Sequence, residues 1–269
     1  MRKDLHGRYT YHGHAESPLV IDNLVILVPG GMDTNVVALD RMNGTIKWIS
    51  KGMGEYPGYN SPLLIELAAR KIIVTFTAYH MLGIDASNGK LLWSHEQVNL
   101  PKEERKPGMG DTHSNTALYE NGFIYYIAGD GNCAVKLKLS QDGSSIDQVW
   151  RNPFIDNYMG GFIKLNDRIF TGSDSRKNLL CLDAQTGQIV DSLKVGCGAV
   201  IWADQLLYYY NQRGEVKLIN PAGEKMEVLS SFKVTKGTKE HFAIPVINAG
   251  ILYIRHGKSL MAYNIKKHQ

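Results

Sequence analysis

The chain has 269 residues, of which 43% are hydrophobic and 21% charged, a balance typical of folded globular proteins rather than disordered ones. Its 30 Lys and Arg residues against 26 Asp and Glu give a net charge of only +4, and no basic block stands out. This composition argues against a nucleic-acid partner. No run of 18 apolar residues is present, so membrane insertion is not expected.

The N-terminal residues 1–8 have a basic start but no apolar segment after it, so they do not read as a secretory signal peptide. The three cysteines, Cys133, Cys181 and Cys197, are widely spaced and form no CxxC pair. An odd, sparse set of this kind predicts partly buried free thiols rather than a disulfide framework.

An internal repeat is the strongest pattern in the chain. Residues 38–48 read Ala-Leu-Asp-Arg-Met-Asn-Gly-Thr-Ile-Lys-Trp, and residues 83–93 read Gly-Ile-Asp-Ala-Ser-Asn-Gly-Lys-Leu-Leu-Trp. Residues 181–187 repeat the first part, with Asp191 at the Trp position, and residues 137–150 give a longer variant that again ends in Trp. In each copy the Asp carboxylate is expected to accept backbone N–H groups of a turn, and the Gly supplies positive φ. The Trp then follows a second strand and fills the space between neighbouring sheets.

Two further strands precede each turn, so that every unit contains four strands. The units cover residues 14–50, 58–98, 113–151, 158–194, 196–234 and 241–269, and the last ends before a fourth strand. A four-strand period of this length is typical of propeller blades. We therefore expect an all-β fold, a β-propeller of four-stranded antiparallel blades in a single domain, 1–269. Residues 8–12 are a candidate closing strand, and residues 99–112 are an insertion between blades.

The repeat Ala-x-Asp-x-x-x-Gly-x-x-x-Trp resembles that of the pyrroloquinoline-quinone (PQQ) propellers. Residues 15–18, 136–145, 149–152 and 253–257 carry a closer resemblance to bacterial PQQ-binding-like β-propeller proteins of the quinoprotein alcohol dehydrogenase-like superfamily. Members of that group usually have eight repeats and an export signal. The resemblance implies a periplasmic or otherwise extracytoplasmic protein that lacks the first two repeats. Its six units form either a closed six-bladed ring or an incomplete eight-bladed one.

The resemblance also raises PQQ with calcium as a cofactor. In the dehydrogenases it implies a stacking Trp, an adjacent Cys-Cys pair, a calcium-binding carboxylate and amide, and an Asp base. This chain has no adjacent cysteines, so none of those residues is carried over to it. Other propellers with this repeat bind no cofactor and act as scaffolds.

Aligning the units places polar side chains around the mouth of the predicted central channel. One equivalent position holds histidine in three units, and the turns between the second and third strands add arginine and histidine. Concave sites with a few polar groups are the usual places for a ligand. The candidate ligand-binding residues are His14, Glu16, Tyr59, Asn60, His113, Asn115, Tyr158, Arg213, His241, Arg255 and His256.

Several kinds of chemistry fit this set. His14, His113 and His241 could bind a metal with Glu16 or Asp111, or they could simply hydrogen-bond to backbone. Arg255 and His256 could grip a carboxylate, or pair with a neighbouring blade.

The prediction is a non-enzymatic binding or scaffold module whose partner is a protein, a polysaccharide or a small ligand. The first alternative is a PQQ- or metal-dependent oxidoreductase. The second is a carbohydrate-processing hydrolase or lyase that uses the pair Glu16 and Asp111. An open ring would expose sheet edges and favour a dimer.

Overall fold

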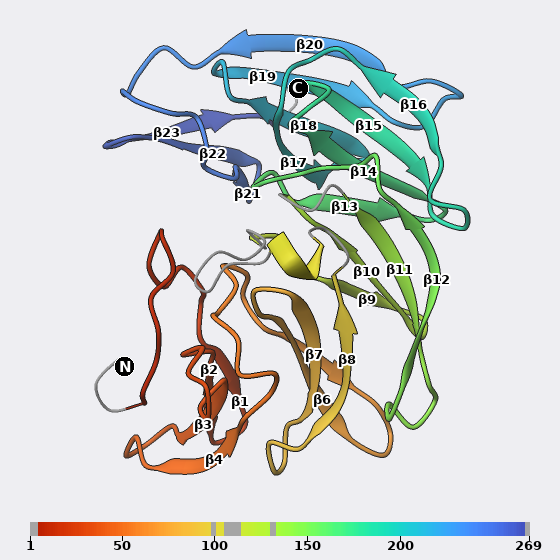
Figure 1. Ribbon diagram of the computed structural model, residues 1–269. Coiled ribbons are helices and arrows are strands. Elements are labelled where there is room, and N and C mark those ends of the chain that lie inside the picture. The colour runs from red at the N-terminus through yellow and green to blue at the C-terminus, as the bar shows by residue number, and fades with distance from the viewer. Residues whose placement is uncertain (1–4, 98–100, 105–113, 130–132, 267–269) are drawn as a thin grey trace. The chain divides into compact units, whose positions relative to one another are not determined.

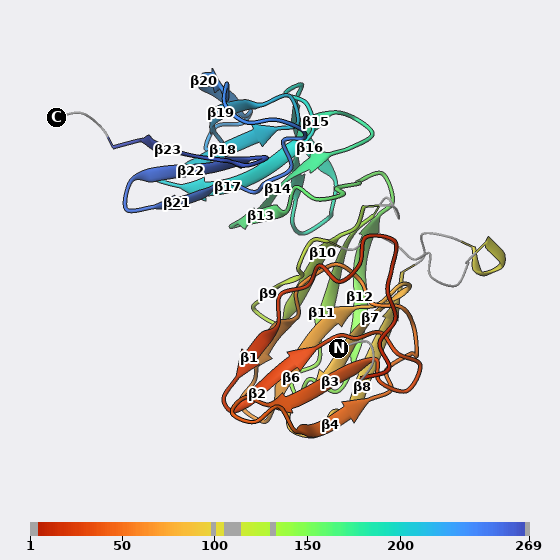
Figure 2. The same ribbon diagram turned by 90° about the vertical axis from the view of Figure 1, so that its left-hand side faces the viewer.

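The computed structural model describes residues 5–97, 101–104, 114–129 and 133–266. Within these residues the chain forms twenty-three strands and one short 3-10 helix, Lys102–Glu104. The strands make five four-stranded sheets and one three-stranded sheet, all antiparallel and each built from consecutive strands. Figures 1 and 2 show each sheet as a twisted blade with its strands in chain order. The predicted all-β architecture of six blades is confirmed.

Blade 1 contains β1 (Leu19–Ile21), β2 (Leu24–Leu27), β3 (Val36–Asp40) and β4 (Ile46–Ser50). Blade 2 contains β5 (Leu63–Glu66), β6 (Lys71–Phe76), β7 (His80–Asp85) and β8 (Leu91–Glu96). Blade 3 contains β9 (Leu118–Glu120), β10 (Phe123–Ile127), β11 (Ala134–Leu139) and β12 (Ile146–Asn152). Blade 4 contains β13 (Phe162–Leu165), β14 (Arg168–Ser173), β15 (Asn178–Asp183) and β16 (Ile189–Leu193). Blade 5 contains β17 (Gly198–Ala203), β18 (Leu206–Asn211), β19 (Glu215–Asn220) and β20 (Glu227–Lys233). Blade 6 contains β21 (Val246–Asn248), β22 (Ile251–His256) and β23 (Ser259–Asn264).

The chain divides into two compact units, Met1–Ile155 with blades 1 to 3 and Asp156–Gln269 with blades 4 to 6. The single domain and the closure of the ring stay predictions. Among the described residues, no helix is long and apolar enough to cross a membrane.

The core lies between the faces of neighbouring blades. In the first unit, Phe76 and Trp93 of blade 2 pack with Tyr126 and Leu137 of blade 3, and all four are buried. The second and third strands of a blade are covered on both faces, so they read as almost continuous apolar runs such as Ile-Ile-Val in β6. Burial of this kind supplies most of the favourable free energy of folding.

The Asp of each repeat forms the predicted turn. Asp40 Oδ1 accepts the backbone N–H groups of Met42 and Asn43 at 2.9 and 3.2 Å, and Asp183 Oδ1 does the same for Gln185 and Thr186 at 2.9 and 2.7 Å. These carboxylates are held by local backbone and serve the hairpin rather than any reaction.

The repeat Trp of blades 1 and 2 joins each of these blades to the next. The indole N–H of Trp48 donates to the Ala86 carbonyl of blade 2 at 3.0 Å, and that of Trp93 donates to the Gly143 carbonyl of blade 3 at 3.2 Å. In both cases the acceptor lies in the turn between the third and fourth strands. A large apolar ring and one directional hydrogen bond therefore fix the neighbouring turn at the same time.

Blade 4 makes the same connection without a Trp. Asp191, at the degenerate Trp position, accepts the backbone N–H of Met226 in blade 5 through Oδ2 at 2.5 Å. Arg168 adds bonds from Nη1 to the carbonyls of Pro221 and Gly223 at 3.1 and 2.7 Å. The direction of the hydrogen bond is reversed, but it still links the fourth strand of one blade to the outer turn of the next.

The proposed closing strand at residues 8–12 is wrong, because those residues form no strand and blade 6 has three strands. Arg8 instead holds this segment against blade 1. Its backbone N–H donates to Pro29, and its Nε and Nη2 donate to the carbonyls of Gly30 and Gly54 at 2.7 and 2.6 Å. Most of the insertion 99–112 lies outside the described residues.

Replacing Gly89 by Ala tests the packing of Trp48. Gly89 has a φ of +77° and a Cβ placed on it would lie 2.5 Å from the indole, whereas Gly44 occupies the same turn position in blade 1 with a φ of +74° and nothing within 4 Å. Gly44→Ala is therefore the matched control for backbone strain alone. We expect Gly89→Ala to lower the free energy of unfolding by about 1–3 kcal/mol more than Gly44→Ala in urea titrations. Equal losses in the two variants would show that the indole does not hold the turn.

Candidate functional site

The segment that leads into each blade meets the turn between its second and third strands. In blade 2 the N–H of Ala78 donates to Tyr56 at 2.9 Å, and in blade 5 the N–H of Gln212 donates to Cys197 at 2.8 Å. We call this end of a blade its turn face, defined by the lead-in segment and that turn. The predicted site residues that the structure describes belong to turn faces, whereas His113 lies outside the described residues.

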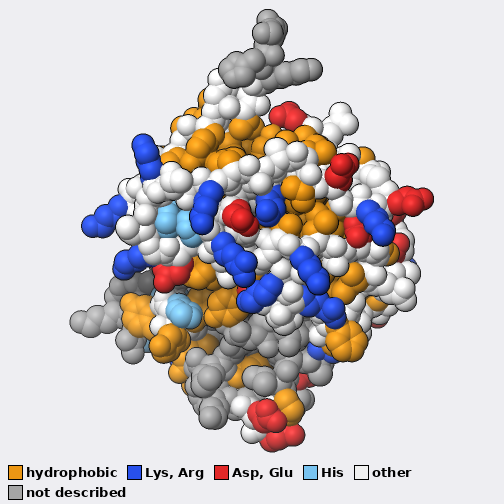
Figure 3. Space-filling view, turned by 90° about the horizontal axis from the view of Figure 1, so that it is seen from above, with side chains coloured by type: hydrophobic (Ala, Val, Ile, Leu, Met, Phe, Trp, Pro, Cys, Tyr) orange, Lys and Arg blue, Asp and Glu red, His pale blue; other side chains and the backbone are white. Residues whose placement is uncertain are grey.

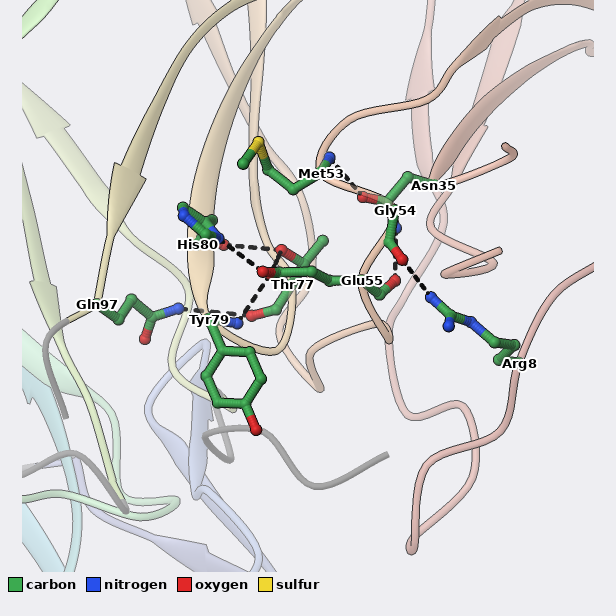
Figure 4. Close-up of polar contacts among 9 residues, drawn as sticks. All are labelled: Arg8, Asn35, Met53, Gly54, Glu55, Thr77, Tyr79, His80 and Gln97. Carbon is green, nitrogen blue, oxygen red and sulfur yellow. Dashed lines mark hydrogen bonds and ion pairs between the residues drawn. The ribbon is translucent and has the colours of Figure 1, made fainter. Parts of the chain in front are cut away.

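Glu55 is the centre of the most extensive polar network on the turn face of blade 2 (Figure 4). Its Oε1 lies 2.7 Å from Nδ1 of His80, and its Oε2 accepts the Thr77 hydroxyl at 2.7 Å and the Tyr79 N–H at 3.0 Å. Burial raises the pKa of Glu55, but the hydrogen bonds from His80, Thr77 and Tyr79 outweigh it and hold the pKa below its ordinary value. Both carboxylate oxygens are therefore committed to the turn.

Asp156 has the same role in blade 4. Its Oδ1 accepts the Ser173 and Ser175 hydroxyls at 2.7 and 3.0 Å, and its Oδ2 accepts the Ser175 N–H at 2.8 Å. A carboxylate from the lead-in segment thus binds the turn in two separate blades. Neither Glu55 nor Asp156 was among the sequence candidates. An acidic residue two or three positions before the aligned one, with a hydroxyl residue at the turn, is the signal that would have found them.

In the first unit the structure brings three lead-in segments side by side. Ser61 connects them, because its Oγ accepts the Ser17 N–H of blade 1 at 3.1 Å and its carbonyl accepts the Thr116 hydroxyl of blade 3 at 3.3 Å. The predicted residues His14, Glu16, Tyr59, Asn60 and Asn115 lie on these three segments.

Two of these residues are structural amides. Asn60 accepts the Phe76 N–H and donates to the Ser61 carbonyl, and Asn115 donates to the Ile127 carbonyl at 3.1 Å. Both are buried. Tyr59 is partly exposed, and its hydroxyl accepts the His12 N–H at 3.2 Å.

Burial shifts the pKa values of two of the predicted residues on these segments, His14 and Glu16. Both ring nitrogens of His14 are shielded from solvent with no hydrogen-bond partner among the described residues, and the ring packs edge-on to Tyr9 at 5.0 Å. Burial lowers the pKa of His14. Burial raises the pKa of Glu16 to about 7, although the Val28 N–H donates to its Oε1 at 2.8 Å.

In the second unit, Tyr158 and Cys197 both bind Asp174. The Tyr158 N–H donates to Oδ2 at 2.6 Å, and the Cys197 thiol donates to Oδ1 at 2.9 Å. Burial and then this hydrogen bond raise the pKa of Cys197 far above its usual range, so the thiol stays protonated and is no nucleophile. Cys197 lines a cavity of about 10 Å³ with Met159, Gln212 and Phe242, which has room for no more than one water molecule.

His241 and His256 stack on each other, with ring centroids 3.7 Å apart. Nδ1 of His241 is hydrogen-bonded to the Tyr210 hydroxyl. Burial lowers the pKa of His241, and His256 and Lys233 lower it further. His256 is buried, and its Nδ1 and Nε2 lie 2.8 and 2.7 Å from the carbonyl oxygens of Lys236 and Lys239.

The predicted pair Arg255 and His256 is therefore split in the structure. His256 faces backbone carbonyls, whereas Arg255 is exposed, and its Nε donates to the Gly257 carbonyl at 3.1 Å. Arg213 is also exposed, on the turn after β18.

The predicted metal and hydrolase sites depend on His113 and Asp111, which lie outside the described residues. Among the residues that are described, no group of three or more His, Cys, Asp and Glu side chains could hold a metal ion.

The Trp and Cys residues of this chain described below do not match those that the resemblance to the dehydrogenases implies for PQQ binding. The indoles of Trp48 and Trp93 are bonded to neighbouring blades, and Trp202 lies at the surface of β17. The three cysteines are buried free thiols at separate positions in the sequence. No stacking indole or adjacent sulfur pair is available from these residues.

Comparison with known proteins fits the repeat architecture. The PQQ_2 family, described as outer membrane protein assembly factor BamB, matches residues 6–192, more than two thirds of the chain. The chain belongs to this family. It is a PQQ-like β-propeller protein. No curated protein matches it significantly.

Three solved structures show the same fold at low identity. The computationally designed Ika8 protein is 10% identical, with a TM-score of 0.66, over 94% of this chain and 71% of Ika8. Quinohemoprotein alcohol dehydrogenase from Comamonas testosteroni is 10% identical, with a TM-score of 0.57, over 90% of this chain and 51% of its own. A europium-containing methanol dehydrogenase is 11% identical, with a TM-score of 0.54, over 85% and 53% of the two chains. The chain thus spans about half the length of either dehydrogenase.

Glu16→Gln tests the burial of that carboxyl. Because the raised pKa lets the folded state keep a proton that the unfolded state loses, the wild type should lose stability as pH rises from about 4.5 to about 7. The glutamine keeps the acceptor for Val28 but cannot ionise. In urea unfolding, we compare the free energy of unfolding of the variant with that of the wild type. We expect this difference to favour the variant by about 2 kcal/mol more at pH 8 than at pH 4. Parallel pH curves for the two proteins would refute this account of Glu16.

Proposed function

We propose that this protein is a non-enzymatic binding module of the PQQ_2 family that acts outside the cytoplasm. Its turn faces would contact a protein partner, a polysaccharide or a small ligand. The observation that carries the proposal is the use of the ionisable groups on these faces. In Glu55, Asp156 and His256, both polar atoms of the side chain are hydrogen-bonded to groups of the turn or of the lead-in segment.

These three groups keep the turns in fixed positions and are themselves not free to act as a base or nucleophile. A catalytic group needs a free atom within hydrogen-bond reach of its substrate. Fixed turns with exposed side chains between them are instead what a binding surface requires, because little conformational entropy is lost on association. The family description, an outer membrane assembly factor, favours both the scaffold role and the extracytoplasmic location.

Native mass spectrometry with PQQ and calcium separates this proposal from the oxidoreductase alternative. We expect no stoichiometric PQQ adduct and no reduction of an electron-accepting dye with primary alcohols. The reason is that the three cysteines are not adjacent in the sequence and that the indoles of Trp48 and Trp93 are bonded to neighbouring blades. One PQQ retained per chain and lost in His241→Ala, together with dye reduction, would overturn the binding-module proposal.

A further inference from the structure

An open groove of about 340 Å³ lies on the turn face of blade 6. Lys239, Glu240, Phe242 and Ala243 of the lead-in segment line one side, and Arg255 and Gly257 at the end of β22 line the other. All of these residues belong to the second unit. The groove neighbours the small cavity beside Cys197, with which it shares Phe242.

The groove is cationic. Arg255 and Lys239 supply two positive charges against the single carboxylate of Glu240, and Lys239 Nζ has no partner among the described residues. Residues 233–258 contain five Lys or Arg and one acidic residue, an excess of four that equals the net charge of the whole chain. The segment that contains the groove residues is therefore more basic than the rest of the chain, in which positive and negative charges balance.

His256 fixes the wall of the groove that carries Lys239. Its two ring nitrogens reach the carbonyls of Lys236 and Lys239, and its imidazole lies against Gly237, where a Cβ would approach the ring to 2.6 Å. Lys239 itself has a φ of +75°, which an L-residue adopts only when its surroundings hold it there. The cation is thus presented from an ordered loop, so little entropy is lost when a ligand binds.

Apolar side chains lie beside these charges. Phe242 is 46% exposed, and Leu260, the cross-strand partner of Arg255 on the outer strand β23, is 71% exposed. Ile244 and Val246, which follow the groove residues in the chain, are also exposed. Figure 3 shows one face of the molecule on which Lys and Arg side chains gather with hydrophobic ones between them.

We propose that this groove binds an acidic segment of a partner protein, with carboxylates on Arg255 and Lys239 and an apolar side chain against Phe242. A peptide suits the site better than a small organic anion, because the groove is open and its apolar surface continues onto the blade edge. Small-molecule sites usually enclose most of their ligand. This inference rests on the binding-module function proposed above and specifies the chemistry of the partner.

Fluorescence anisotropy with labelled peptides tests the inference. A peptide of alternating Glu and Leu should bind the wild type, whereas one of alternating Lys and Leu, or of Glu and Ser, should bind at least tenfold more weakly. The double variant Lys239→Glu/Arg255→Glu should weaken binding of the Glu-Leu peptide at least tenfold. The matched double variant Lys194→Glu/Lys225→Glu, which reverses two exposed charges elsewhere in the same unit, should stay within twofold of wild type.

Two further measurements keep the result decisive. Lys239→Gln/Arg255→Gln removes the charges without adding new ones, and circular dichroism checks that each variant is folded. Raising the salt from about 50 to about 500 mM should weaken binding severalfold, since exposed charges are screened.

Equal binding by the two pairs of charge variants would overturn the proposal. So would full displacement of the peptide by free phenylacetate at equal concentration, which would assign the groove to small organic anions. The PQQ experiment described above tests the binding-module function separately. Failure of the groove proposal can therefore be distinguished from failure of that function.

Discussion

The structure depends on the contact between the fourth strand of one blade and the outer turn of the next. A blade alone has two faces and cannot bury both, so every blade needs a neighbour held at a fixed distance. The indoles of Trp48 and Trp93 meet this need with a large apolar surface and one hydrogen bond to a turn carbonyl. Asp191 meets it through a carboxylate that accepts from the turn of blade 5. The requirement is for a link at this position, and the residue that provides it can change its chemistry.

The turn faces, at the other end of the strands, also need specific side-chain partners. A turn that meets a lead-in segment buries backbone N–H groups and hydroxyls that must find partners. Glu55 and Asp156 supply acceptors, while His256 supplies ring nitrogens to two carbonyls. His256, one of the candidate ligand-binding residues, therefore bonds to the backbone of its own blade. The groups that we propose for recognition lie at the surface of blade 6 and include Arg255, Lys239 and Phe242.

Features that depend on near neighbours in the chain were predictable. The strand pairs and the turns at Asp40, Asp85 and Asp183 follow from apolar runs and a fixed Asp–Gly spacing, and the structure has all of them. Among the described residues, the last blade has three strands, as expected from the sequence. The role of Glu55 does not follow from near neighbours, because its partners Thr77 and His80 lie more than twenty residues away and only the alignment of the repeats relates them. Residues 8–12 read as a strand, yet the reach of the Arg8 side chain to Gly30 and Gly54 determines where they lie.

The contrast between His256 and Arg255 shows how one turn can serve both stability and recognition. Adjacent residues in a strand point to opposite faces, so His256 faces inward to the loop 236–239 while Arg255 faces outward beside Leu260. The buried side chain fixes the backbone from which the exposed one projects. A charge at the surface costs little free energy to leave unpaired, but it attracts an oppositely charged partner over several ångströms. A propeller whose buried polar groups bond to its own turns can therefore still bind a partner through its surface charges, and at blade 6 we propose that Lys239 and Arg255 have this role.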